Sequence, residues 1–375
     1  MSENFLIRDV FNTRNVSELS SNIQKHFPSF DTKRFHSGID PLLGDATFSE
    51  RKKAITDLLL ELLPEDINQC ADVLVNACPP PYSGEGLDGD MDRFIVAPMA
   101  DVISIRGIDH FEPSMKALHT LTQAFSAEWA IRPFIEKYPD ESLKMLKEWT
   151  GDPNPHVRRL VSEGSRPYLP WGKKLTVTDL DPKWSLALLG RLKNDSSDYV
   201  LTSVANHLND LTKKHADVVL NALDEWKDQI NTHPVIPFYK KALRTIIKNG
   251  NIKALELIGF SGSVQVEINK LKCNSPVEMG KRLSFSFEVV SMDDEPQDIL
   301  IDFIIHFKKS NGTNAPKVFK LTTFTLPANE LRTINKSFSF KPITTRKYYP
   351  GTHHLEIMVN GKVRKRQSFE VKIPV

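Results

Sequence analysis

The chain has 375 residues, of which 40% are hydrophobic and 26% are charged, and its formal net charge is +2. These proportions are ordinary for a soluble globular protein, and the length predicts two or three domains. No segment approaches the roughly 18 consecutive apolar residues of a membrane span, and charges interrupt the first ten residues, where a secretory signal needs an apolar core. We therefore expect a cytoplasmic protein with no membrane partner.

The chain lacks the common signatures of metal and cofactor sites. Its three cysteines, Cys70, Cys78 and Cys273, are odd in number and form no CxxC pair, which argues against a disulfide framework. The adjacent His353 and His354 would point to opposite faces of a strand. There is no GxSxG, P-loop, GxGxxG after a strand, or HExxH motif. We therefore expect no metal, no nucleotide and no other cofactor.

The first 260 residues have the pattern of helices. Apolar residues recur at helical spacing in the segments 51–63, 67–75 and 114–125. The triple proline at 79–81 and the glycines of residues 84–89 predict a loop between helical blocks.

A repeat occupies the middle of the chain. Residues 152–157 align with residues 195–200, and a looser third copy runs through residues 238–246. A period of about 40 residues with two helices each is typical of HEAT-like repeats, which stack into a solenoid with a concave binding face. The predicted helix pairs are 141–149 with 156–163, 182–192 with 198–210, and 216–229 with 237–248.

Residues 152–171 combine a helix start, two arginines, a carboxylate and a rigid exit. Asp152 can cap a helix and Gly164 can end it. Arg159 and Glu163 are four residues apart, so they share one helical face. The loop that follows is basic and contains Arg166, Lys173 and Lys174. This segment suits an anionic partner at a site that also holds a positive charge.

The period changes near residues 259–262, after which seven segments alternate like strands. Asn360-Gly361 predicts a hairpin between the last two. Seven short strands suggest an immunoglobulin-like sandwich, although the usual Cys…Trp…Cys core is absent. From Ser261 onward there are 18 lysines and arginines against 11 aspartates and glutamates, which points mildly to a polyanionic partner. The predicted strands are 264–271, 282–290, 297–308, 317–324, 331–340, 353–359 and 363–371.

Three carboxylates are the candidate catalytic groups. Glu128 lies beside Trp129, Glu163 lies on the repeat helix described above, and Asp210 ends the segment 198–210. Glu163 and Asp210 fall on the second helices of successive repeats, so a solenoid would stack them on one side. For any single acid, a structural salt bridge or helix cap is the competing interpretation.

Aromatic and basic residues supply the candidate contacts to a ligand. Trp129 or Trp171 could face a cation, since an indole ring attracts one by roughly 0.5–2 kcal/mol, although a core position is the alternative for both. Ion pairs within the repeats are the alternative for Arg158 and Arg244 in particular. The candidate phosphate-binding cations are Arg158, Arg159, Arg166, Lys173, Lys174, Arg244, Lys248, Lys362, Arg364, Lys365 and Arg366.

At these residues the chain resembles the AlkC-type DNA alkylation repair glycosylases, which are related to AlkD among the HEAT-like repeat glycosylases. Some members of the family carry a C-terminal immunoglobulin-like domain, as expected here. The matching segments are FSAEWAIRPF (125–134), HVRRLVSEGSRP-x-LPW (156–171), DYV-x-x-SVANHLND (198–210) and ALRT-x-IK-x-G (242–250).

The resemblance implies a monofunctional glycosylase of base excision repair. Its substrate would be duplex DNA that contains N3-alkylated bases, such as 3-methyladenine and 3-methylcytosine. We expect a mainly α, monomeric protein, with a HEAT-like repeat glycosylase domain at 1–260 and an immunoglobulin-like β-sandwich at 261–375. Glu128, Glu163 and Asp210 would form its acidic cluster.

The chain departs from the family pattern at three positions. Tyr168 stands where a basic residue is usual, Leu201 stands where an arginine is common, and Lys241 replaces a histidine. These changes bear on DNA affinity more than on chemistry, because the three acids remain. Two other interpretations compete with a glycosylase: a DNA-structure binder without chemistry, and a scaffold that binds proteins.

Overall fold

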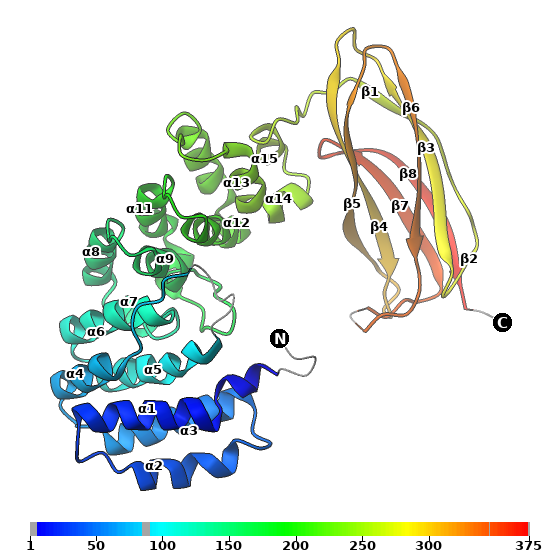
Figure 1. The fold of residues 1–375 in the computed structure, drawn as a ribbon. Helices are drawn as coiled ribbons and strands as arrows, with labels where there is room; N and C mark the ends of the chain where they lie inside the picture. Colours follow the sequence, from blue (N-terminus) through cyan, green and yellow to red (C-terminus); the bar gives the residue numbers. More distant parts are fainter. Residues whose placement is uncertain (1–5, 85–90, 345, 374–375) are drawn as a thin grey trace. The chain divides into compact units, whose positions relative to one another are not determined.

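A computed structural model describes residues 6–84, 91–344 and 346–373 (Figure 1). The chain divides into two compact units. The first comprises Met1–Ala222 with Asp228–His233, and the second comprises Leu223–Lys227 with Pro234–Val375. The second unit thus contains the last helices together with all the strands, whereas the sequence predicts a boundary near residue 260. The predicted glycine loop at 84–89 lies almost entirely outside the described residues.

Helices make up the first unit, and they follow one another in chain order from blue to green in Figure 1. None of the helices in the described segments is both long and apolar enough to cross a membrane. The described helices that lie in the first unit, wholly or for most of their length, are η1 (Ile7–Val10), α1 (Thr13–His26), α2 (Thr32–Ile39), η2 (Asp40–Leu42), α3 (Phe48–Leu62), α4 (Ile67–Ala77), η3 (Met91–Ile95), α5 (Val96–Arg106), α6 (Phe111–Ala124), α7 (Arg132–Lys137), α8 (Pro139–Trp149), α9 (Pro155–Gly164), α10 (Thr176–Leu180), α11 (Pro182–Leu192) and α12 (Asp198–Trp226).

Helix α9 begins and ends for reasons visible in the sequence, with one correction. Its N-cap is Asn154, not Asp152: the Asn154 side chain accepts a hydrogen bond from the backbone N–H of His156 at 2.8 Å. Asp152 instead accepts from the N–H of Asn154 at 2.7 Å and so shapes the preceding turn. Pro155 occupies the first helical turn, where its missing N–H costs nothing, and the helix ends at Gly164 as predicted.

The predicted repeat helices are confirmed for the first two pairs and differ in the third. Helices α8 and α11 both pack against α9. Helix α12 is continuous through 198–226 except for a kink at His215, whose φ of −124° and ψ of 43° are not helical. The predicted helix 237–248 is split into α13 (Val235–Ala242) and α14 (Arg244–Lys248), because Leu243 leaves the helical conformation between them.

The strands form a two-sheet sandwich, which confirms the predicted fold class of helical repeats followed by an all-β domain. One sheet has the order β1-β3-β6 and the other β2-β8-β7-β4-β5. The short β2, which runs parallel to β8, is the strand that the alternation pattern misses. The strands are β1 (Val266–Cys273), β2 (Val277–Glu278), β3 (Arg282–Ser291), β4 (Gln297–Lys308), β5 (Asn314–Leu326), β6 (Leu331–Ser339), β7 (Gly351–Val359) and β8 (Lys362–Lys372).

Phenylalanines contribute much of the hydrophobic core of the sandwich. Side chains of β3 alternate between buried and exposed, as one-sided burial of a strand requires. The ring of Phe303 lies 5.2 Å from that of Phe285 in the facing sheet, and the rings of Phe307 and Phe340 are 6.0 Å apart. The core is therefore aromatic, with ring separations in the range of favourable pairs.

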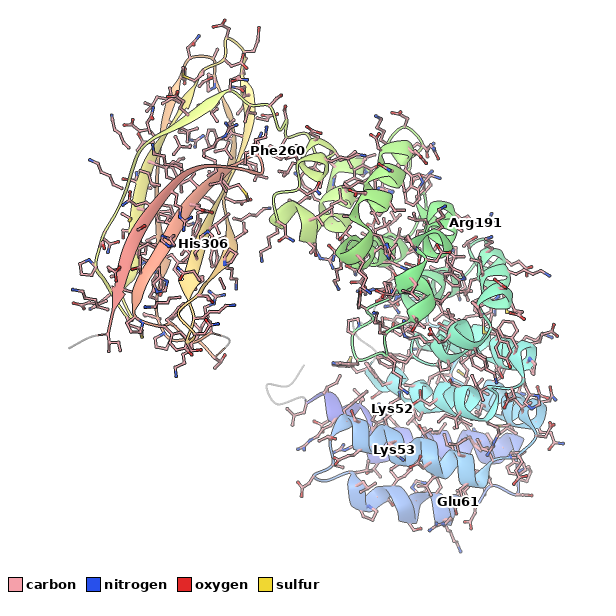
Figure 2. The ribbon with its side chains drawn as sticks, turned by 180° about the vertical axis from the view of Figure 1, so that it is seen from behind. Lys52, Lys53, Glu61, Arg191, Phe260 and His306 are labelled. Atoms are coloured by element: carbon pink, nitrogen blue, oxygen red, sulfur yellow. The ribbon has the colours of Figure 1, made fainter. Side chains whose placement is uncertain are left out.

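The second unit also contains α13, α14 and α15 (Ile252–Glu256), and Phe260 follows these helices before the first strand (Figure 2). The β7–β8 hairpin at Asn360-Gly361 is confirmed. Asn360 has a φ of +43° and is buried. Its side chain accepts from the N–H of Leu300 at 2.7 Å and donates to the carbonyls of Ser261 at 2.8 Å and Asp298 at 3.0 Å. One turn residue thus joins the segment before β1 to the sheet.

Asn360→Ala should destabilise the sandwich by about 2–3 kcal/mol, because it leaves buried backbone groups without partners. Asn329→Ala is the matched control: Asn329 also has a positive φ, of +55°, but it is exposed. Calorimetric unfolding of both variants beside wild type measures the difference. Equal losses would mean that the turn conformation, and not the buried bonds, makes Asn360 important.

Candidate active site

Glu163, on α9, lies at the centre of a network of charged side chains. Its Oε1 is 2.6 Å from Nη1 of Arg166 and 3.5 Å from Nη2 of Arg159. The hydroxyl of Ser203, on α12, donates to its Oε2 at 2.5 Å. Burial alone would raise the pKa of the Glu163 carboxyl, but the two guanidinium groups and the hydroxyl outweigh that effect and hold it below its usual range. Glu163 is therefore ionised at neutral pH.

Arg166 connects Glu163 to the second predicted acid. Its Nε lies 2.9 Å from Oδ2 of Asp210, which is on α12. The other oxygen of Asp210, Oδ1, is 3.0 Å from Nζ of Lys213. Arg166 and Asp210 are both buried, so neither charge would be tolerated there without the other.

Arg159 connects Glu163 to the third acid. Its Nη1 is in contact with Oε2 of Glu128 and lies 2.8 Å from Oγ of Ser126, which also donates to that oxygen at 3.0 Å. The guanidinium carbon lies 5.1 Å from the ring centre of Tyr199. Burial alone would lower the pKa of Arg159. The pKa is raised instead by the nearby Glu128, Tyr199 and Glu163, so this arginine stays charged.

The three predicted carboxylates are thus brought together. Acids and arginines alternate in the order Glu128, Arg159, Glu163, Arg166 and Asp210. Three negative charges face two guanidinium groups, and Lys213 adds one partly exposed cation at the Asp210 end. These charges balance, so a further positive charge would be attracted only where it lies close to one of the carboxylates.

Glu128 and Arg159 line a cavity of about 460 Å³ in the first unit. Its walls are largely aromatic. Neither Glu163 nor Asp210 is among the described residues that line it, so these two acids act on the cavity from behind Arg159. The aromatic lining residues are Tyr82, Phe94, Phe125, Trp129, His156, Trp171 and Tyr199.

Trp129 and Trp171 form one wall of this cavity. Their rings are 6.3 Å apart with planes 29° from parallel, and the Trp129 indole N–H donates to the carbonyl of Pro170 at 3.3 Å. Trp171 is 77% exposed and has a φ of +59°. A large exposed indole in the left-handed region is held by its surroundings and not by local preference.

A larger cavity of about 1180 Å³ shares the same two tryptophans. Its lining includes Lys52 of α3 (Figure 2), whose Nζ lies 5.0 Å from the ring centre of Trp129 and 2.7 Å from Oδ2 of Asp101. Lys173 and Lys174 also line it. The smaller cavity is the better candidate for chemistry because it contains Glu128.

Arg132 is a residue that the sequence reasoning missed, and it shapes the loop that carries Trp171. It is buried, its Nη1 donates to the carbonyls of Gly164 at 2.9 Å and Arg166 at 2.7 Å, and its Nε donates to that of Lys173 at 3.1 Å. Burial lowers its pKa to about 10, so it remains charged. The sequence did offer one signal for Arg132, because it lies in the segment 125–134, which matches the family pattern.

The predicted phosphate-binding arginines of the first unit have other contacts. Arg158 makes a bidentate pair with Asp195 at 2.7 and 2.9 Å, which favours a structural ion pair, although this pair joins two successive repeats and does not lie within one repeat. Arg159 and Arg166 lie within the acid–arginine chain, where their contacts favour neutralisation of the acids over phosphate binding. Lys174 is 2.6 Å from Asp179, a contact that leaves its ammonium about half exposed.

The remaining predicted cations lie in the second unit. Arg244 donates to the carbonyl of Lys241 at 2.8 Å, and Arg364 donates to that of Val264 at 3.0 Å. Arg366 lies 3.7 Å from Glu356. Lys248 ends α14, while Lys362 and Lys365 lie on β8. Their role in binding DNA stays a prediction.

Leu201, one of the three departures from the family pattern, is buried on α12. An arginine at this buried position would need a carboxylate partner for its charge. Arg158, which occupies the matching position of the preceding repeat, has such a partner in Asp195. Leucine instead contributes to the core of the repeat.

His207 supplies a pH-dependent contribution to the stability of the site. It is fully buried beside the acids, its Nδ1 lies 2.9 Å from the carbonyl of Ser162, and its Nε2 lies 3.1 Å from Oγ of Ser185. Burial lowers its pKa to about 4. The folded protein therefore keeps this imidazole neutral at pH values where the unfolded chain would protonate it.

Stability should fall between about pH 6.5 and pH 4, because in that window only the unfolded state binds a proton at His207. The contribution lost is about 3 kcal/mol. His207→Gln should flatten this decline, whereas His26→Gln, at an exposed position in α1, should not. Urea unfolding followed by tryptophan fluorescence measures it, since four of the five tryptophans lie in the first unit. A decline as steep in His207→Gln as in wild type would contradict this assignment.

Comparison with known proteins places this geometry in a family. Residues 267–373 match the family model described as the C-terminal Ig-like domain of the uncharacterised protein YhaZ. The chain is 35% identical to the uncharacterized protein YhaZ of Bacillus subtilis (strain 168), over 97% of this chain and 99% of that protein.

A solved structure is similar over nearly the whole length. It is the Pseudomonas fluorescens alkylpurine DNA glycosylase AlkC bound to DNA containing an abasic site analog, with 34% identity and a TM-score of 0.82 over 98% of this chain and 100% of that one. The resemblance stated from the sequence is confirmed, and the chain belongs to the AlkC family, together with YhaZ.

Proposed function

We propose that this protein is a monofunctional DNA glycosylase that excises cationic N3-alkylated bases, 3-methyladenine and 3-methylcytosine, from duplex DNA. The observation that carries the proposal is the acid–arginine chain of Glu128, Glu163 and Asp210 beside an aromatic cavity. Membership of the AlkC family supports it, since the relative of known structure is an alkylpurine DNA glycosylase bound to DNA.

The chemistry follows from the charge of the lesion. A base alkylated at N3 is positively charged and leaves readily, so its glycosidic bond needs little protonation of the leaving group. The developing oxocarbenium sugar is a second cation. Preorganised carboxylates stabilise both without reorganisation in the transition state, and this effect contributes several kcal/mol in a buried site.

The arginines have a specific part in this mechanism. Without Arg159 and Arg166, buried acids would take up protons and lose the charge that the reaction needs. With them, Glu163 stays ionised, and Glu128 presents a carboxylate to a cation at the wall of the cavity. One of the three acids positions or deprotonates the attacking water and another stabilises the cation.

The aromatic walls recognise the base. A cationic base stacked on Trp129 or Trp171 gains about 0.5–2 kcal/mol from the indole face, which a neutral base does not. Tyr199 already holds a cation, the guanidinium of Arg159, at 5.1 Å. Selectivity for charged lesions is therefore built into the cavity wall as well as into the acids.

Duplex DNA is the macromolecular partner in this proposal, and the protein acts as a monomer in the cytoplasm. Cations outside the buried network supply the backbone contacts, with Lys173 and Lys174 in the first unit and the lysines and arginines of β8 in the second. The two competing interpretations, a DNA binder without chemistry and a protein scaffold, give no reason for three acids, two of them buried, to meet beside a cavity.

Base release from methylated duplex DNA, measured by chromatography under single-turnover conditions, tests the proposal. Wild type should release 3-methyladenine and 3-methylcytosine. Glu163→Gln should slow release by about 100-fold or more while DNA binding persists, because it removes transition-state charge stabilisation. Glu148→Gln, at an exposed position on α8, is the control and should behave as wild type.

Two further readouts keep this test decisive. Glu163→Gln leaves the guanidinium groups of Arg159 and Arg166 short of a partner, so thermal unfolding of this variant is measured as well. Glu128→Gln, on the cavity wall, is a second variant that should slow base release to the same extent. Release unchanged in both variants would remove the acids from the mechanism. No release by wild type would leave a structural binder if DNA binds, and a protein scaffold if it does not.

A further inference from the structure

The strongest unassigned feature of the first unit is a cluster of lysines around Asp179. The Asp179 side chain is only 3% exposed, and its Oδ2 lies 2.6 Å from Nζ of Lys174. Nζ of Lys214 contacts the same oxygen, and the Tyr168 hydroxyl donates to Oδ1. Burial opposes ionisation of Asp179, but these three donors hold the pKa of its carboxyl well below the usual range.

Tyr168 adds a third lysine to the cluster. Nζ of Lys213 lies 4.3 Å from the centre of the Tyr168 ring, and that of Lys174 lies 5.7 Å from it. Contacts of this kind attract an ammonium group by about 0.5–1 kcal/mol at exposed sites. The residue that departs from the family pattern thus gathers cations around it, in place of the one basic side chain that is usual there.

The kink in α12 sets the position of two of these lysines. Lys213 and Lys214 precede His215, where the helical conformation is interrupted. Nε2 of His215 lies 2.7 Å from the backbone carbonyl of Asp179, so the kink and the Asp179 segment are joined. Cations are favoured at the end of a helical segment, where backbone carbonyls lack partners.

The charges of the cluster do not cancel. Lys213 is paired with Asp210, whereas Lys174 and Lys214 carry two positive charges against the one negative charge of Asp179. The three side chains remain 49%, 42% and 46% exposed. A buried carboxylate therefore orders ammonium groups that still face solvent, which is the arrangement that a phosphate group needs.

We propose that Lys174, Lys213 and Lys214, arranged by Asp179 and Tyr168, form a binding site for a backbone phosphate of the DNA duplex next to the alkylated nucleotide. The inference rests on the proposed function and deepens it. Lys213 gives the reason for the location: its Nζ is also 3.0 Å from Oδ1 of Asp210, so the phosphate site directly adjoins the acid–arginine chain.

The test measures the salt dependence of DNA binding. Each phosphate that is neutralised contributes about 0.9 to the slope of log affinity against log salt concentration. The proposed site neutralises one phosphate, so Lys214→Gln and Lys174→Gln should each lower the slope by at most about 0.9, which makes the fall in affinity between about 50 and 200 mM salt up to about 3.5-fold smaller than in wild type. Fluorescence anisotropy with a duplex that contains an abasic-site analogue gives the slopes.

Two controls make the outcome specific. Lys144→Gln changes an exposed lysine of α8 and should leave the slope at the wild-type value. Lys214→Arg keeps the charge and should restore the slope that Lys214→Gln loses. Each single variant leaves Asp179 one lysine, and thermal unfolding midpoints verify that the variants are folded.

The proposed function and the phosphate site can fail separately. Base release by wild type is measured on the same preparation. If wild type releases methylated bases but Lys214→Gln and Lys174→Gln keep the wild-type slope, the phosphate site is overturned and the glycosylase stands. If the slopes fall as expected and no base is released, the phosphate site stands on a DNA-binding protein without the proposed chemistry.

Discussion

The site depends on one constraint: three carboxylates meet in one network inside a folded protein, and each needs a cationic partner. Charge burial is costly, and an acid without a partner would shift its pKa and become neutral. Arg159 and Arg166 meet this need because each lies between two acids, and Lys213 pairs with Asp210 at one end of the network. At the other end Glu128 lines the aromatic cavity, where a carboxylate suits a cationic base and an oxocarbenium sugar.

The repeat architecture brings these charges together. Glu163 and Asp210 lie on α9 and α12, the second helices of successive repeats, and Arg166 follows α9 closely enough to reach both. Arg132 holds the loop after α9 through three backbone carbonyls and thereby positions Trp171 beside Glu128. Trp171 adopts a backbone conformation that is rare for a large residue, which a rigid loop explains.

Local patterns predicted the elements well and their partners poorly. Helical periodicity, proline and glycine gave α8, α9 and α11, and Asn360-Gly361 gave the last hairpin, because these features depend on neighbours in the chain. The meeting of Glu163 with Asp210 followed from the repeat. The pairing of Arg158 with Asp195 and the contacts of Arg132 could not be predicted, since side chains about 40 residues apart meet only once the repeats have stacked. Asn154, and not Asp152, caps α9 for a smaller reason: two turn residues, separated by Pro153, compete for one role.

If the carboxylates of the acid–arginine chain select a cationic lesion, base release must depend on the charge of the base, so the most direct measurement compares two bases that differ in charge. Single-turnover release is measured from one duplex that carries 3-methyladenine and from another that carries hypoxanthine, a neutral purine. We expect release of 3-methyladenine and no detectable release of hypoxanthine. Comparable release of both would contradict it, because the acids would then not work through the charge of the base.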